Sequence, residues 1–147
     1  MTDTLTASAS AVVDAPADEV FAYICRPTAH PAISGDGSVR GIVTGPEQLS
    51  GKGDRFGTRM KMDGLPYRIT NTVVEFEPGK RIAWSHPGKH RWRWEVEALP
   101  DGRSTVTETF DMSPSPLKPA LRLLGYPGAH QSNVERSVAN VARHFAD

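Results

Sequence analysis

Between Val39 and Met112 the chain carries a succession of strand-like runs separated by short turn sequences. The turns fall at Gly45-Pro46, Asp63-Gly64, Glu77-Pro78-Gly79, Pro87-Gly88 and Pro100-Asp101-Gly102. Glycine, proline and aspartate in such clusters favour tight connections between neighbouring strands. No long helical pattern separates the runs, and parallel strands would need such a crossover. This segment therefore predicts an antiparallel meander.

Helical patterns lie on both sides of the meander. A strand-like run from Leu5 to Val13 is broken by Asp14-Ala15-Pro16, and apolar residues then follow at three- and four-residue spacing. This predicts a helix from Ala17 to about Arg26-Pro27. A second short helix or turn is expected from Thr28 to Ser34, before Gly35-Asp36-Gly37 forces a loop.

The last third of the chain predicts further helix. Leu117, Ala120, Leu121 and Leu124 have helical spacing, which Gly125-Tyr126-Pro127-Gly128 interrupts. A longer helix follows, because its apolar residues form one continuous stripe at offsets of four, three and four: Val134, Val138, Val141 and Phe145. We expect this helix to cover one face of the sheet.

Size and charge exclude several classes of function. A chain of 147 residues is expected to form one domain. Its 17 basic side chains equal its 17 acidic ones, so the chain has no net positive charge that would attract nucleic acid or an anionic membrane surface. The sequence has neither a signal-peptide pattern nor an apolar run of the ~18 residues that a membrane span needs. We therefore expect a soluble, cytoplasmic protein without stable membrane insertion. The lone Cys25 excludes an internal disulfide.

Strand alternation gathers large apolar side chains on one face of several runs. A period of two places a glutamate, Glu108, among the apolar neighbours of its own run. The face-sharing sets are Trp92, Trp94, Val96 and Ala98; Val106, Glu108, Phe110 and Met112; Met60 and Met62; and Ile82, Trp84 and His86. A curved sheet around one helix leaves space between such groups, which predicts a ligand cavity. The alternative is that they fill a solid core.

Four stretches in order resemble one family. They are Ala15 to Phe21, Leu49 to Phe56, Val73 to Trp84, and Trp94 to Thr109. Together they are similar to the START-like (SRPBCC) superfamily, in particular its polyketide cyclase/dehydrase branch. The resemblance implies an α+β helix-grip fold, in which a seven-stranded antiparallel sheet wraps a long C-terminal helix, with short helices after the first strand. It also implies a cavity for lipids, polyketides, steroids or similar molecules. Such a fold does not by itself fix the function.

The polar side chains that the alternation directs into this cavity are Asn71, His86 and Glu108. Glu108 in a dry pocket favours its neutral form and can donate a proton, and His86 can accept one, which suits aldol cyclisation or dehydration. The alternative is that Glu108 pairs with a neighbouring arginine and His86 lies at an exposed strand end. The predicted ligand-binding residues are Met60, Met62, Asn71, Trp84, His86, Trp92, Trp94, Glu108, Phe110, Val134 and Val138.

The remaining histidines and cations suggest no cofactor. His30 and His130 lie near expected loop or helix starts, where they either guard the pocket mouth or are simply solvated. The five histidines lack the spacing of a metal site, so we expect neither metal nor cofactor. The cations from Lys89 to Arg93 alternate with tryptophans, so they face away from them, and we expect no nucleic-acid groove.

Three functions remain open. The leading hypothesis is binding of a hydrophobic small molecule, such as a lipid or polyketide, for transport, sequestration or sensing. The first alternative is a polyketide cyclase/dehydratase-type enzyme that uses His86 and Glu108, and the second is a protein-interaction module with a vestigial pocket. The sequence leaves open the ligand, the choice between monomer and homodimer, and whether residues 114–128 form a lid.

Overall fold

The computed structural model describes residues 6–35, 39–62, 65–86, 90–112 and 126–146, without the side chains of Val43, Met62 and residues 126–130. The chain begins with β1 (Thr6–Val13), α1 (Ala17–Ile24), the 3-10 helix η1 (Pro27–Ala29) and α2 (His30–Ile33). It continues with β2 (Val39–Thr44), β3 (Arg55–Met62), β4 (Leu65–Glu77), β5 (Arg81–Ser85), β6 (Arg91–Ala98), β7 (Ser104–Asp111) and α4 (Tyr126–His144).

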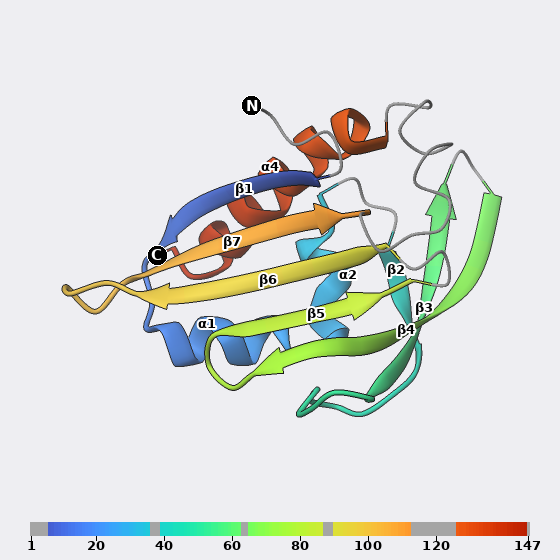
Figure 1. Ribbon diagram of the computed structural model, residues 1–147, viewed down its shortest axis with the longest axis horizontal. Helices are drawn as coiled ribbons and strands as arrows, with labels where there is room; N and C mark the ends of the chain where they lie inside the picture. Colours follow the sequence, from blue (N-terminus) through green and yellow to red (C-terminus); the bar gives the residue numbers. More distant parts are fainter. Residues whose placement is uncertain (1–5, 36–38, 63–64, 87–89, 113–125, 147) are drawn as a thin grey trace.

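The described strands form a seven-stranded antiparallel sheet with the order β1-β7-β6-β5-β4-β3-β2 (Figure 1). From β2 to β7 each strand pairs with the next one along the chain, and β1 joins the sheet beside β7. Glycines with positive φ make two of the turns, Gly79 (φ +75°) after β4 and Gly102 (φ +86°) after β6. The predicted antiparallel meander and α+β helix-grip fold are confirmed.

The helices lie together against one face of the sheet (Figure 1). The helix α4 contacts β1 and β7, and it buries Val134, Val138 and Val141 there. These three residues belong to the predicted apolar stripe. Phe145, its fourth member, lies just beyond the end of α4, and its ring meets that of Tyr23 edge-on at 5.5 Å. Burial of this stripe is what seats the helix in the curve of the sheet.

The first helix also follows the sequence pattern. Pro16 caps α1 in an extended conformation, and Asp18 and Glu19 stand in its first turn, where acidic groups complement the helix dipole. Its buried face includes Phe21, whose ring packs edge-on against Phe76 of β4 at 5.8 Å. The expected short helix at Thr28–Ser34 is present as η1 and α2.

The predicted interruption of helix from Tyr126 to Gly128 is wrong, because these residues form the first turn of α4, where proline is tolerated. Several other sequence expectations fall outside the described residues: the helical spacing from Leu117 to Leu124, the turns at Asp63-Gly64 and Pro87-Gly88, the question of a lid over residues 114–125, and the position of the His130 side chain. The strands on either side of each turn, β3 with β4 and β5 with β6, do pair as antiparallel neighbours.

Candidate ligand-binding site

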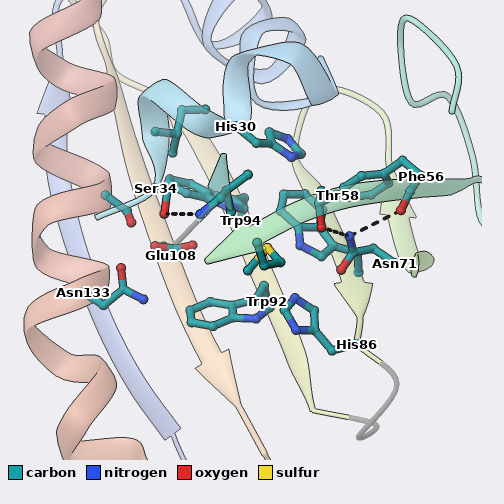
Figure 2. Close-up of a pocket in the computed structure, with 15 residues that line it drawn as sticks. His30, Ser34, Phe56, Thr58, Asn71, His86, Trp92, Trp94, Glu108 and Asn133 are labelled. Atoms are coloured by element: carbon teal, nitrogen blue, oxygen red, sulfur yellow. Dashed lines mark hydrogen bonds between the residues drawn. The ribbon is translucent and has the colours of Figure 1, made fainter. Parts of the chain in front are cut away.

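A pocket lies between the concave face of the sheet and the helices α2 and α4 (Figure 2). Its empty space is about 550 Å³ when the open mouth is included. The centre of a water-sized sphere can occupy about 80 Å³ of the pocket. One bound water needs only ~10–15 Å³ by that measure, so the pocket has room for several water molecules or for a small ligand. Side chains from β3, β4, β5, β6 and β7 form its floor, and side chains from α2 and α4 form its wall.

Three aromatic rings in mutual contact form the inner end of the pocket. His30 of α2 lies nearly parallel to Trp84 of β5, with 4.7 Å between ring centroids and 21° between ring planes. Phe56 of β3 meets both rings edge-on, at 5.3 Å from His30 and 5.5 Å from Trp84. Such a cluster presents flat, polarisable surfaces to an apolar ligand.

His30 is a neutral histidine in this cluster. Its Nε2 lies 2.8 Å from the carbonyl oxygen of Ile24, and the side chain is buried. Because a carbonyl oxygen only accepts, Nε2 carries the proton and Nδ1 is the unprotonated nitrogen. Desolvation lowers the pKa of His30 to about 4, although the bond to Ile24 opposes this shift. The expectation of a solvated histidine is therefore wrong for His30.

Asn71 of β4 brings an amide to the pocket floor. It is 1 % exposed, and its Nδ2 donates to the carbonyl oxygen of Phe56 at 3.4 Å and to Oγ1 of Thr58 at 3.3 Å (Figure 2). The contact with a backbone carbonyl fixes which end of the amide is nitrogen. The other end, Oδ1, is buried and has no hydrogen-bond partner among the described residues.

The opposite side of the pocket carries a carboxyl and two polar groups of α4. Glu108 of β7 is 5 % exposed, and it lies on the same side of the pocket as Asn133 (Figure 2). Ser137 of α4 accepts a hydrogen bond from the backbone N–H of Gly35 at 3.0 Å. A Cβ at Gly35 would run into the backbone oxygen of Asn133, so this glycine lets the chain pass close to α4.

The outer end of the pocket carries a second aromatic group. The ring centroids of His86 and His90 are 4.8 Å apart, and Trp92 lies 6.0 Å from His86 and 4.8 Å from Phe110. His86 and Trp92 line the pocket, whereas Phe110 is fully buried beside it. The pocket therefore has rings at both ends and polar groups between them.

Seven of the predicted site residues line this one pocket: Met60, Asn71, Trp84, His86, Trp92, Trp94 and Glu108. Phe110, Val134 and Val138 are buried in the core next to it, and the side chain of Met62 lies outside the described residues. The lining residues that the sequence did not single out for ligand binding are Ile33, Ser34, Val39, Phe56, Thr58, Asn133 and Ser137. Strand alternation signals Phe56 and Thr58, because both share a face with Met60.

The two arginines of the neighbouring strand β6, Arg91 and Arg93, lie on the other face of the sheet from Glu108. Trp94 stands opposite Glu108 in the register of β6 and β7, so the neighbouring Arg93 points away. Arg93 instead contacts Glu75 at 2.8 Å and Asp111 at 3.3 Å, while Arg91 contacts Glu75 at 2.7 Å. Glu108 therefore belongs to the pocket, not to the charged outer network.

The sequence matches one known family over nearly its whole length. The family described as "Polyketide cyclase / dehydrase and lipid transport" matches residues 4–146. The chain belongs to this family. Its curated relatives include the Mycobacterium tuberculosis proteins named uncharacterized protein Rv0088, 39 % identical over 143 residues, and MT0096, 38 % identical over 143 residues. Both matches cover 95 % of this chain but only 63 % of the relative, so the chain spans less than two thirds of their length.

Solved structures support the fold of this polyketide cyclase/dehydrase family member. The Polyketide_cyc-like protein Cgl2372 from Corynebacterium glutamicum superposes with a TM-score of 0.67 at 18 % identity, covering 98 % of this chain and 93 % of its own. A protein from Arthrobacter aurescens gives a TM-score of 0.71 at 16 % identity, covering 97 % and 90 %. These structures support the fold, and the family description, which names polyketide cyclase/dehydrase and lipid transport, is that of a fold that holds hydrophobic ligands.

The described residues contain no group of three or more His, Cys, Asp or Glu side chains placed to hold a metal ion. Among the helices in the described part of the chain, none combines the length and apolar character needed to cross a membrane.

Proposed function

We propose that this protein binds a hydrophobic small molecule that carries a hydroxyl group. The supporting observation is Oδ1 of Asn71, a buried acceptor without a partner among the described residues, on the floor of a pocket walled by aromatic rings. In this proposal the apolar body of the ligand packs between His30 and Trp84 at one end and Trp92 at the other. Its hydroxyl group donates to Asn71.

The preference for a hydroxyl follows from the cost of an unsatisfied polar group. A buried acceptor without a hydrogen bond costs about 1–3 kcal/mol, and a ligand that donates to it recovers that free energy. A ligand of the same shape without the hydroxyl leaves the cost in place, which is why polar pockets discriminate strongly against such analogues. The family description, which includes polyketides and lipids, agrees with a largely apolar ligand.

The test compares two probes that differ only in the hydroxyl, 2-naphthol and naphthalene, by quenching of tryptophan fluorescence. Wild-type protein is expected to bind 2-naphthol about tenfold more tightly, equivalent to about 1.4 kcal/mol. Asn71→Leu should remove this preference while naphthalene still binds, which shows that the pocket remains folded. Thr70→Val, on the exposed face of the same strand, is the matched control and should keep the preference.

The hydroxyl proposal is wrong if wild-type protein binds the two probes equally, or if Asn71→Leu keeps the preference. Native mass spectrometry of the purified protein gives a separate test of the pocket. A co-purified apolar molecule that Trp84→Ala fails to retain would support ligand binding, because Trp84 forms part of the inner aromatic wall.

Acid–base catalysis is the second candidate, because Glu108 and His86 line the same pocket. In an aldol cyclisation, His86 would remove a proton beside one ketone of a poly-β-ketone, and the carbanion would attack a second carbonyl carbon of the chain. Glu108 would then protonate the new alkoxide. Glu108→Gln keeps the shape of the side chain but removes its acid. An enzyme would lose turnover of such a substrate with binding retained, whereas a carrier would show no turnover in either form.

A further inference from the structure

Thr58 of β3 lies beside Asn71 on the polar floor of the pocket. In the register of β3 and β4, Asn71 stands opposite Phe56 and Thr58 stands opposite Ile69, so Asn71 and Thr58 are diagonal neighbours on the face that lines the pocket. Thr58 is 2 % exposed, and its Oγ1 lies 3.3 Å from Nδ2 of Asn71 (Figure 2). The two buried side chains therefore form one polar group.

The hydroxyl group of Thr58 still has a proton to donate. An amide nitrogen only donates, so in the contact with Asn71 the Oγ1 of Thr58 is the acceptor. A hydroxyl also carries one O–H proton, and within the described part of the chain no hydrogen bond uses the proton of Thr58. Oδ1 of Asn71 is a buried acceptor that likewise has no partner among these residues. The pocket floor therefore offers one donor and one acceptor side by side.

One small group can reach both of these atoms. The nitrogen and the oxygen of an amide are about 2.2 Å apart, which places Oδ1 of Asn71 within about 5.5 Å of Oγ1 of Thr58. Two O–H···O hydrogen bonds of about 2.8 Å each can span that distance. A single oxygen between the two side chains can therefore accept the proton of Thr58 while its own proton goes to Asn71.

We propose that Asn71 and Thr58 together bind one hydroxyl group of the ligand, which donates to Oδ1 of Asn71 and accepts from Oγ1 of Thr58. This role of Thr58 rests on the proposed function, which assigns only the bond to Asn71. Both hydrogen bonds at once require a neutral alcohol or phenol. The pair of side chains distinguishes such a ligand from ketones, ethers and carboxylates of similar shape.

A ketone or ether oxygen satisfies only half of this pair. Such an oxygen can accept from Thr58, but it carries no proton for Asn71. It would bring two acceptors close together, itself and Oδ1 of Asn71, and it would leave that buried acceptor unsatisfied. An apolar ligand such as naphthalene satisfies neither side chain. The site therefore favours a hydroxyl over a group that only accepts.

A carboxylate is disfavoured by the groups around it. An ionised carboxylate enters an apolar pocket only when a positive charge or several hydrogen bonds compensate for its lost hydration. The carboxyl group of Glu108, which is 5 % exposed, already lies across the pocket (Figure 2). The ring of His30 at the inner end is neutral, because burial lowers its pKa to about 4. Ionised fatty acids are therefore poorer ligands than the corresponding alcohols.

The experiment measures quenching of tryptophan fluorescence by 2-naphthol and by naphthalene, on wild type, Thr58→Val and Thr58→Ser. Valine has nearly the shape of threonine without the hydroxyl. Thr58→Val should therefore bind 2-naphthol about fivefold more weakly than wild type, the loss expected for one hydrogen bond, and should bind naphthalene within twofold of wild type. Thr58→Ser keeps the hydroxyl and is the matched control, which should retain the preference for 2-naphthol.

Two further probes on wild-type protein need no variant. They are 2-methoxynaphthalene, which accepts a hydrogen bond but cannot donate one, and 2-naphthoate, which is ionised at pH 7. Both should bind at least fivefold more weakly than 2-naphthol.

The paired role of Asn71 and Thr58 is wrong if Thr58→Val keeps the wild-type preference for 2-naphthol over naphthalene. That result would leave the proposed function intact, with the bond to Asn71 alone. The paired role is also wrong if the methyl ether or 2-naphthoate binds wild type as tightly as 2-naphthol. Equal binding of 2-naphthol and naphthalene to wild type would instead overturn the hydroxyl proposal and the role of Thr58 together.

Discussion

Lowering the pH from 7 to 5 should destabilise the folded protein through His30. Burial lowers the pKa of this side chain from 6.5 to about 4, whereas in the unfolded chain the imidazole titrates near its ordinary value. The unfolded state therefore binds more protons than the folded state between pH 6.5 and 4. Stability must rise with pH across that window, so it is lost as the pH falls.

The size of the loss follows from the two pKa values. At pH 7 both states hold His30 mostly neutral and its contribution is close to zero. At pH 5 the unfolded imidazole is almost fully charged while the buried one is still mostly neutral, and the linkage relation gives a loss of about 2 kcal/mol, growing to about 3 kcal/mol at pH 4. Because small domains are stable by only about 5–15 kcal/mol, this is a large share of the total.

The assay is urea denaturation followed by tryptophan fluorescence at pH 7, 6 and 5, on wild type and on His30→Phe. The variant loses the bond to the carbonyl of Ile24, which costs about 1 kcal/mol at every pH, but it should lack the pH-dependent loss of about 2 kcal/mol. His144→Gln, which changes an exposed histidine at the end of α4, should keep that loss. An equal pH dependence in wild type and His30→Phe would refute the assignment to His30.

Two further changes test the walls of the site and the outer face of the sheet. Gly35→Ala should lower the free energy of unfolding, measured by urea denaturation, by about 1–3 kcal/mol, because the new Cβ meets the backbone oxygen of Asn133 and lies 2.7 Å from the Oδ1 of that residue. Gly51→Ala, where a Cβ meets nothing within 4 Å, is the control and should change this free energy little. Equal effects of the two substitutions would contradict the close contact with α4. Glu75→Gln should cost about 1–3 kcal/mol at pH 7, because it leaves Arg93 without its closest acid. Since Arg93 holds the pKa of Glu75 at about 2, the stability that this carboxylate contributes to wild type should be lost as the pH falls from about 4.5 to 2. If Glu75→Gln lost the same amount of stability over this pH range, the result would argue against the ion pair.

The sequence by itself determined which side chains share a face of the sheet. Alternation along a strand is a property of the backbone, so Trp94 and Glu108 had to point one way and Arg93 the other once their runs were strands. The turn residues fixed where the strands end, and the resemblance of four ordered stretches supplied the family. Strand alternation therefore gave the side of the sheet for Asn71 and Trp84, and both side chains line the pocket that the structure places there.

Only the tertiary structure decided what stands across from those side chains. His30 and Asn133 come from α2 and α4, and their approach to the sheet depends on how close the chain at Gly35 passes to α4, which no local pattern encodes. Arg59 and Arg68 likewise become neighbours only through the pairing of β3 with β4, which a neutral overall composition does not reveal. Residue spacing sets the direction of a side chain, whereas its partner depends on long-range packing.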